Sequence, residues 1–238
     1  MNNLLVKQIG IFINEKIKIF DEFKEGLLNI DKFGHIIVFY ISDTINQYSL
    51  SNININVAQI INVSQCEIEI ISFHIPENSI IIDIKPYFPV EDRVKNCSIH
   101  ESFSQLPEFF GKYNDDLPKI NSKSQIIPDI SFCGIIKKEN GICYLKFDNI
   151  FEDYLSYYEK FSHLYVIWWF DKFEKDFYRK TLQCNPPYEN APKTGIFASR
   201  SPVRINPVAL TLAKIINVDK KNKTIQISLT DAFDNTPF

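Results

Sequence analysis

The stretch FASRSPVRINPVAL, from Phe197 to Leu210, decides how this chain is interpreted. Arg200 and Arg204 stand beside Pro202 and Pro207, whose rings remove backbone donors and fix the φ angle. Because a residue before proline is pushed to extended conformations, the turn should be rigid and should hold both guanidinium groups in place. Such a turn suits an anionic ligand. On spacing alone, however, a solvated loop whose arginines pair with surface carboxylates is the preferred interpretation.

Two further motifs accompany this turn. An apolar segment precedes it, Phe161-Ser162-His163-Leu164 followed by Trp168-Trp169-Phe170. The first half of the chain contains Asp83-Ile84-Lys85-Pro86-Tyr87-Phe88-Pro89. From the residues alone, Asp83 and Lys85 are a charge pair on an edge strand and Tyr87 is an ordinary packing residue.

The three motifs resemble the signatures of the TsaA-like family, the tRNA methyltransferases called TrmO. The turn is similar to the family pattern F-A-T-R-S-P-x-R-P-N-P-I-G-L, the apolar segment to F-S-H-L-W-V-L-F-W-F, and the third motif to D-I-K-P-Y-L-P. Ile205 and Ala209 replace the usual proline and glycine of the turn. The resemblance implies a small β-barrel-like fold, S-adenosylmethionine as cofactor without a Rossmann domain, and methylation of N6 of a modified adenosine beside the tRNA anticodon.

The resemblance also implies a set of site residues. The cofactor-binding residues would be Phe197, Ala198, Ser199, Arg200, Ser201, Arg204, Asn206, Leu210 and His163. Arg200 or Arg204 would hold the methionine carboxylate or an RNA phosphate by a bidentate contact. The catalytic residues would be Asp83, Lys85 and Tyr87. Of these, Asp83 or Tyr87 would accept or orient the proton of the amine.

The chain contains an internal repeat. Residues 31–40 line up with 159–168, and residues 57–63 line up with 212–218, in the same order. The second copy has additional residues between these anchors. They include most of the turn at Phe197–Leu210, here called the arginine turn. The first copy lacks the arginines but alone retains the D-I-K-P-Y motif. We therefore predict an internal pseudo-dimer whose two copies share one active site, with a further homodimer left open.

Each copy is predicted to be mainly β, an α+β fold in which a small β-barrel carries one helix packed on its sheet. The predicted domains are a degenerate copy at 1–96, a linker at 97–127 and a second copy at 128–238. In the second copy, Asn140-Gly141 is typical of a tight hairpin turn. Helical spacing of apolar residues favours a helix over 150–161. The remaining strands are expected at 130–137, 142–147, 164–170, 208–218 and 224–229.

Composition excludes several other classes of protein. The chain has 238 residues, 45% of them hydrophobic, which is ample for a packed core. Its apolar runs are too short for a membrane helix, so we expect a soluble, cytoplasmic protein. The 5 cysteines and 4 histidines lack the spacing of a disulfide framework or a metal site, and we predict no metal. The 7 glycines form neither a Rossmann nor a P-loop motif.

The formal net charge of −3 gives little support to RNA binding, although the basic excess lies in the second copy. The local candidate for a tRNA contact is the group Lys175, Arg179 and Lys180. Phe177 and Tyr178 interleave these cations with rings that could stack on bases. The alternative is a solvated charged face.

Two functions remain open from the sequence. The first is an S-adenosylmethionine-dependent methyltransferase acting on a tRNA adenosine. The alternative is a non-catalytic TsaA-like binding protein that has kept the fold and the cofactor site. We prefer the first. The alternative is supported by the division of the motifs between the two copies and by the connection at 138–141, which is too short for the Pro-Arg-Gln element that lines the cofactor pocket in the family.

Overall fold

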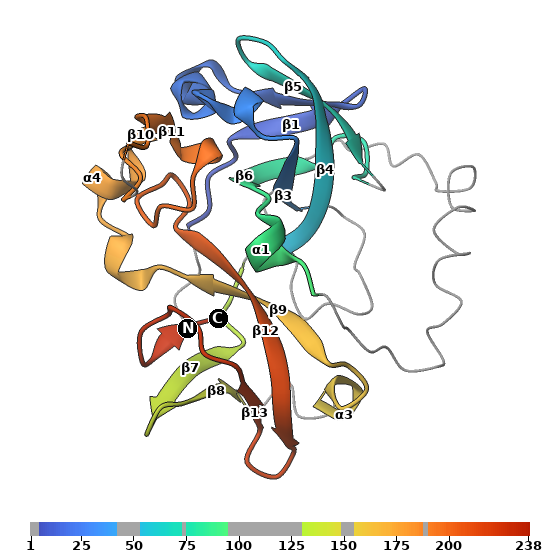
Figure 1. Cartoon of the computed structure of the whole chain (residues 1–238), viewed down its shortest axis with the longest axis vertical. Coiled ribbons are helices and arrows are strands. Elements are labelled where there is room, and N and C mark those ends of the chain that lie inside the picture. The colour runs from blue at the N-terminus through green and yellow to red at the C-terminus, as the bar shows by residue number, and fades with distance from the viewer. Residues whose placement is uncertain (1–4, 42–52, 73–74, 95–129, 149–154, 188–189) are drawn as a thin grey trace, which may run out of the picture. The chain divides into compact units, whose positions relative to one another are not determined.

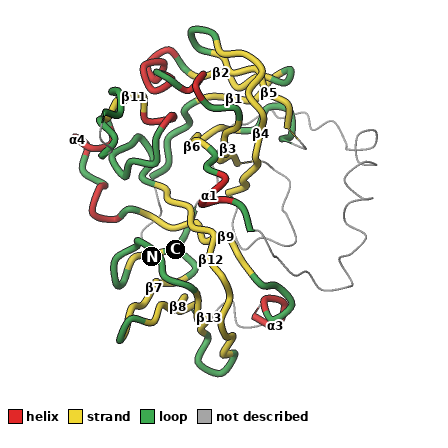
Figure 2. Tube along the Cα trace, in the orientation of Figure 1, coloured by secondary structure: helices red, strands yellow, loops and turns green. Residues whose placement is uncertain are grey.

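The computed structural model describes residues 5–41, 53–72, 75–94, 130–148, 155–187 and 190–238, which form two compact units (Figure 1). The first unit takes its described residues from Met1–Phe88, Ser122–Ser131 and Lys172–Val208. The second takes them from Pro89–Asn121, Phe132–Asp171 and Ala209–Phe238. Strands dominate both units (Figure 2), which confirms the predicted mainly β, α+β fold.

The sheet of the first unit closes into a barrel with the strand order β1-β2-β5-β4-β3-β6. All neighbouring strands are antiparallel, and they are β1 (Gly10–Ile13), β2 (Lys16–Ile19), β3 (His35–Ile41), β4 (Ile53–Val63), β5 (Glu67–Ser72) and β6 (Ile80–Pro86). Strand β6 pairs with both β1 and β3 and so closes the barrel. Because β6 has a neighbour on each side, every one of its residues is buried.

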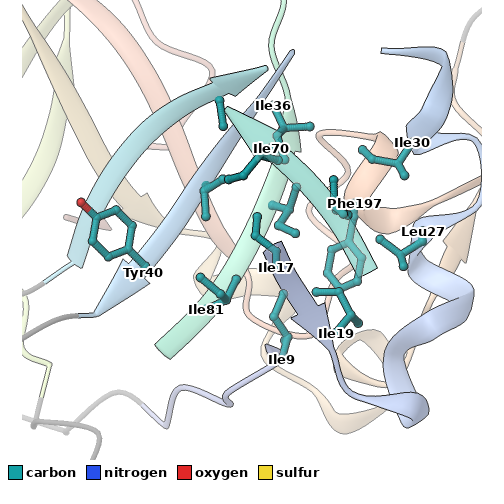
Figure 3. Close-up of a cluster of buried hydrophobic side chains, with 14 of the residues drawn as sticks. Ile9, Ile17, Ile19, Leu27, Ile30, Ile36, Tyr40, Ile70, Ile81 and Phe197 are labelled. Atoms are coloured by element: carbon teal, nitrogen blue, oxygen red, sulfur yellow. The ribbon is translucent and has the colours of Figure 1, made fainter. Parts of the chain in front are cut away.

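Isoleucine side chains fill much of this barrel, because alternate residues of an antiparallel strand point to the same face. Ile17, Ile36 and Ile81 are each fully buried in one apolar cluster. Phe197 joins this cluster, although it comes from the second half of the sequence (Figure 3). The barrel core is therefore completed by a distant segment of the chain.

That segment, 172–208, is built of short elements. They are the end of η5 (Asp171–Phe173), α4 (Asp176–Arg179), β10 (Gln183–Cys184), β11 (Thr194–Gly195) and η6 (Ile196–Ala198). It packs beside the 3-10 helix η1 (Asp21–Leu27), which η2 (Ile30–Lys32) follows in the chain. The backbone N–H of Gly195 donates to Leu28 O at 2.9 Å. The arginine turn follows η6 directly, so this docking fixes its starting point.

Two glycines make the docking possible. A Cβ atom on Gly195 would collide with the carbonyl oxygen of Gly26. A Cβ atom on Gly26 would lie 2.6 Å from the ring of Phe197. Since real Cβ atoms do not approach other atoms so closely, only glycine allows the two backbones to come together here.

The second unit holds a six-stranded sheet with the order β14-β7-β8-β13-β12-β9. Its strands are β7 (Gly134–Glu139), β8 (Ile142–Phe147), β9 (His163–Trp169), β12 (Val208–Asp219), β13 (Thr224–Ile227) and β14 (Thr236–Pro237). The predicted tight turn is confirmed, since Asn140 and Gly141 both have positive φ, 51° and 78°. The short helices are α1 (Pro89–Asp92) and α3 (Leu155–Tyr158). Of the predicted helix over 150–161, residues 150–154 lie outside the described residues, α3 covers 155–158, and 159–161 are not helical.

The two sheets share one strand order when β1, β2, β5, β4, β3 and β6 are matched to β7, β8, β13, β12, β9 and β14. The register of β4 with β5 shifts between Ile60 and Asn62, and that of β12 with β13 shifts between Ile215 and Asn217. These are matching positions of the predicted repeat. The likeness therefore extends from the sequence to the bulges of the sheets.

The turns before β6 and β14 are also alike. Asn78 and Asn235 both have left-handed φ angles, 65° and 64°. The N–H of Asn78 donates to Phe12 O, and the N–H of Asn235 donates to Ile136 O, at 2.8 Å in both cases. Descent of the two halves from one domain stays a prediction, but it accounts for this agreement.

The compact units differ from the predicted domains. Residues 172–208 belong by sequence to the predicted copy at 128–238, yet they group with the N-terminal barrel. The physical reason is the core position of Phe197 and the close approach at Gly195. Sequence periodicity cannot reveal that residues 172–208 pack on the N-terminal barrel, because it indicates which residues are buried and not which segment covers them. The predicted linker at 97–127 lies outside the described residues.

The contact between Gly26 and Gly195 gives a first prediction. Gly195→Ala should lower the free energy of unfolding by about 1–3 kcal/mol, because the added methyl group must displace backbone. Gly34→Ala is the matched control, since a Cβ atom there meets nothing within 4 Å. Chemical denaturation of the three proteins provides the measurement. Equal stability of Gly195→Ala and the parent would contradict the packing described here.

Candidate functional site

The arginine turn and the D-I-K-P-Y motif meet in the first unit through a buried ion pair. The Arg204 guanidinium donates to Asp83 Oδ1 from Nη2 at 2.6 Å and from Nε at 3.1 Å. Arg204 is 0% exposed and Asp83 is 2% exposed. Two motifs from opposite halves of the sequence are thus joined by a charge-assisted contact that excludes water.

The remaining donors of Arg204 are also used by protein groups. Its Nη2 reaches Ile84 O at 2.8 Å, and its Nη1 reaches the carbonyl oxygens of Ser199 and Ser201, each at 3.2 Å. The prediction that Arg204 contacts the cofactor does not agree with this geometry. A guanidinium without exposed surface, surrounded by protein acceptors, supports the turn from within.

Lys85 is the second cation beside the same carboxylate. Its Nζ lies 2.8 Å from Asp83 Oδ2 and 5.3 Å from the centroid of the Phe39 ring. Burial, followed by the charge of Arg204, lowers the pKa of Lys85 to about 7. One carboxylate therefore serves two buried cations, and the lysine is the one that loses its proton readily.

Asp83 and Lys85 were predicted to be catalytic, but they lack the exposed surface that contact with a substrate requires. Each is 2% exposed, so neither offers surface to a substrate. The edge-strand interpretation is wrong as well, because β6 is paired on both sides. The structure assigns both side chains to the junction between β6 and the turn.

Asn206 is a third buried polar residue of the turn, at 1% exposure. Its Oδ1 accepts from the backbone N–H of Lys7 at 2.8 Å and from Arg179 Nη2 at 3.2 Å. Its Nδ2 donates to Lys7 O at 2.7 Å and to Ile82 O at 2.6 Å. The amide uses both acceptor positions and both donors on protein groups. The predicted cofactor contact of Asn206 therefore has no hydrogen-bonding position left in this structure.

The partly exposed side chains near this junction form what we call the Arg200 cluster, defined as Arg200, Ser201, Tyr87, Phe88 and His35. The Arg200 guanidinium stacks on Phe88 at 5.1 Å and donates from Nη2 to Pro86 O at 2.9 Å. The rings of Tyr87 and His35 are 6.2 Å apart. A planar cation and aromatic rings thus lie together at the end of β6.

The other predicted cofactor residues divide between the two units. Phe197 and Ala198 are buried in the barrel core, and the Ser199 hydroxyl donates to Ile196 O at 3.2 Å. These side chains support the fold, and the role of the three residues in cofactor binding stays a prediction. His163 and Leu210 belong to the second unit, where both are half-buried. Their role in cofactor binding stays a prediction.

The predicted RNA-contact residues lie on or beside α4. Lys175 and Lys180 are exposed, and Phe177 is 72% exposed. The Phe177 and Tyr178 rings are 4.7 Å apart. Arg179 departs from the prediction, because its guanidinium points inward and donates to Ile205 O at 2.8 Å and to Leu5 O at 2.6 Å. It is an anchor of the arginine turn and not an exposed cation.

Sequence reasoning missed His35 and Phe88 as members of the cluster. Both had a usable signal. His35 occupies the repeat position that matches His163, and Phe88 directly follows Tyr87 in the D-I-K-P-Y motif. The anchoring role of Arg179 had none, because only the fold shows where its side chain points.

No group of three or more His, Cys, Asp and Glu residues in the described part of the chain is placed to hold a metal ion. Among the described residues, no helix is long and apolar enough to span a membrane.

The environment of Lys85 gives a second prediction. The unfolded lysine, near pKa 10.5, keeps its proton between about pH 7 and 10.5, where the folded lysine has lost it. Folding therefore releases a proton, and stability should rise with pH in this window by up to about 1.4 kcal/mol per pH unit. Denaturant titrations at pH 7 and 9 should show a smaller rise in Lys85→Met. The exposed-site control Lys18→Met should retain the full rise, and equal pH slopes in all three proteins would contradict the assignment.

Comparison with known proteins places the chain in a family. The family model of the tRNA-methyltransferase O N-terminal domain matches residues 134–238. A probable S-adenosyl-L-methionine-binding protein of Methanocaldococcus jannaschii is 31% identical over 105 residues, which are 44% of this chain and 82% of that protein. A tRNA (adenine(37)-N6)-methyltransferase of Mus musculus is 39% identical over 79 residues, 33% of this chain.

The matched lengths differ widely. The chain spans only 17% of the mouse protein. A crystal structure of TrmO from Pseudomonas aeruginosa aligns with a TM-score of 0.35 and 14% identity, covering 41% of this chain and 62% of that one. The D-I-K-P-Y motif at residues 83–87 lies outside the part matched by the family model. On the extent of the match to the archaeal relative and to the family model, the chain belongs to the TrmO/TsaA-like family.

Proposed function

We propose that this protein is an S-adenosylmethionine-dependent methyltransferase that acts on N6 of an adenosine beside the tRNA anticodon. The observation that carries the proposal is the Arg200 cluster, in which a guanidinium stacks 5.1 Å from the Phe88 ring next to the buried junction of two family motifs. The names of the mouse and archaeal relatives support the same reaction and cofactor.

The residues of the cluster fit the chemical parts of S-adenosylmethionine. Arg200 offers a planar cation to a carboxylate, which it can bind in a bidentate manner. Phe88 and Tyr87 offer aromatic faces to a purine, and such faces also attract a cationic sulfonium. When bound, the cofactor supplies an electrophilic methyl group.

The protein's own part in the reaction is to position two reactants and to manage one proton. Arg200 would hold the cofactor by its carboxylate. The Tyr87 hydroxyl would orient the target amine by accepting a hydrogen bond from it, and the proton that the methylated amine loses would pass to solvent. Asp83, held by Arg204 and Lys85, would contribute indirectly by fixing β6 and the turn. In this proposal the half-buried residues contact the cofactor and substrate, and the fully buried residues hold β6 and the arginine turn in place.

The two halves of the chain would act as a pseudo-dimer in which one site uses segments of both. The first unit supports this proposal, because it contains the D-I-K-P-Y motif of one half and the arginine turn of the other. One cofactor would then bind per chain. Whether two chains associate further is decided by sedimentation of the purified protein.

The tRNA would contact the exposed surface of α4, defined by Lys175, Phe177 and Lys180. The exposed Phe177 ring can stack on an unpaired base, and the two lysines can approach phosphates. Lys180 also lies 3.5 Å from Asp176, an exposed pair that contributes little and can exchange partners.

The alternative function is that of a TsaA-like protein that binds the cofactor without turnover. Asn140 and Gly141 form a two-residue turn between β7 and β8, where the family carries a longer loop. Incubation with methyl-labelled S-adenosylmethionine and unmodified or modified tRNA distinguishes the two functions. Label at an anticodon-adjacent adenosine supports catalysis, whereas cofactor binding without label supports the second function.

The third prediction concerns the cofactor. Arg200→Gln should weaken S-adenosylmethionine binding by about tenfold or more, since a hydrogen bond to a charged group contributes about 1.5–3 kcal/mol. Arg200→Lys should restore only part of the affinity, because it keeps the charge and loses the planar fork. Calorimetry measures both, with exposed Arg93→Gln as the control. Parent-like affinity in Arg200→Gln would remove the cluster from the cofactor site.

The fourth prediction concerns RNA. Combined Lys175→Glu and Lys180→Glu substitutions should weaken tRNA binding and reduce its salt slope by about 1 to 2, because fewer counterions are released. Phe177→Ala should weaken binding by about 1–3 kcal/mol through lost stacking. Exposed Lys32→Glu is the control. An unchanged slope in the double variant would show that RNA approaches another surface.

A further inference from the structure

Arg179 links two segments that are far apart in the sequence. Its Nε donates to Ile205 O at 2.8 Å, inside the arginine turn. Its Nη2 donates to Leu5 O at 2.6 Å and to Asn206 Oδ1 at 3.2 Å. One guanidinium therefore joins the turn to the segment that leads into β1.

Asn206 completes the connection from the other side. Near the barrel the N-terminal segment runs beside β6, where the N–H of Ile9 donates to Ile81 O at 2.9 Å. The Asn206 amide then stands between Lys7 and Ile82, bonding to backbone groups of both. The side-chain amide thus takes the place of a peptide group between the two segments.

Loss of Arg179 would leave this connection incomplete. Asn206 Oδ1 would keep only the bond from Lys7, and the carbonyl oxygens of Ile205 and Leu5 would lose their bonds to the guanidinium. Ile205 and Asn206 are buried, and leaving a buried polar group without its partner costs about 1–3 kcal/mol, whereas the exposed Leu5 carbonyl would bind water instead. Arg204 anchors the turn to β6 independently, so the turn should loosen at its C-terminal end without unfolding the barrel.

We propose that Arg179 is a positioning residue, which holds the end of the arginine turn and thereby fixes Arg200 beside Phe88. The neighbouring cations Lys175 and Lys180 are exposed, unlike Arg179. They therefore serve as matched comparisons. The effect of Arg179 on the cofactor rests on the proposed function. Its effect on the turn does not.

The test begins without any ligand. Amide hydrogen exchange should be faster by about tenfold or more in Arg179→Gln than in the parent, in peptides covering residues 5–9 and 204–208. Arg179→Lys, which can reach one acceptor, should give an intermediate rate. Lys175→Gln should exchange like the parent. Parent-like exchange in Arg179→Gln would overturn the proposal.

Binding measurements then separate positioning from RNA contact. Arg179→Gln should lower S-adenosylmethionine affinity by about threefold to tenfold and leave the salt slope of tRNA binding unchanged. Lys175→Gln should leave S-adenosylmethionine affinity unchanged and reduce the salt slope of tRNA binding. A reduced salt slope in Arg179→Gln with unchanged exchange would identify an RNA contact and refute positioning. If the parent binds no S-adenosylmethionine, the proposed function fails, while the exchange result still decides the role of Arg179.

Discussion

The first unit depends on the buried ion pair between Arg204 and Asp83. A lone charge in this position would carry a large desolvation penalty, so the buried guanidinium of Arg204 requires the Asp83 carboxylate. The pair therefore makes the placement of the arginine turn against β6 close to obligatory. Lys85 adds a second cation next to the carboxylate, and the protein accommodates it because burial favours its neutral form near pH 7.

This constraint separates residues that hold the site from residues that can meet a ligand. Arg204, Asp83 and Asn206 are buried and engaged, whereas Arg200 and Tyr87 keep exposed surface. A sequence motif shared by a family can thus have an architectural part and a contact part.

Much of the fold could be predicted from the sequence, because alternation and Asn-Gly turns are local signals. The hairpin at Asn140-Gly141 follows from such a pattern, whereas the matching bulges near Asn62 and Asn217 are seen only in the structure. The exchange of residues 172–208 could not be predicted, since it depends on close approach at Gly195. The site was predicted in part. Its motifs were recognised, but the burial of Arg204 depends on tertiary contacts.

The central claim is that Arg204 and Asp83 act as one unit that joins the two halves of the chain. A double-mutant cycle with Arg204→Met and Asp83→Leu tests it most directly, made in the Lys85→Met background so that no second cation can pair with Asp83. Each single variant should lose about 3–5 kcal/mol of stability, as expected for a broken buried pair. The double variant should recover part of that loss, with a coupling of roughly 2 kcal/mol or more. Strictly additive losses would contradict the account.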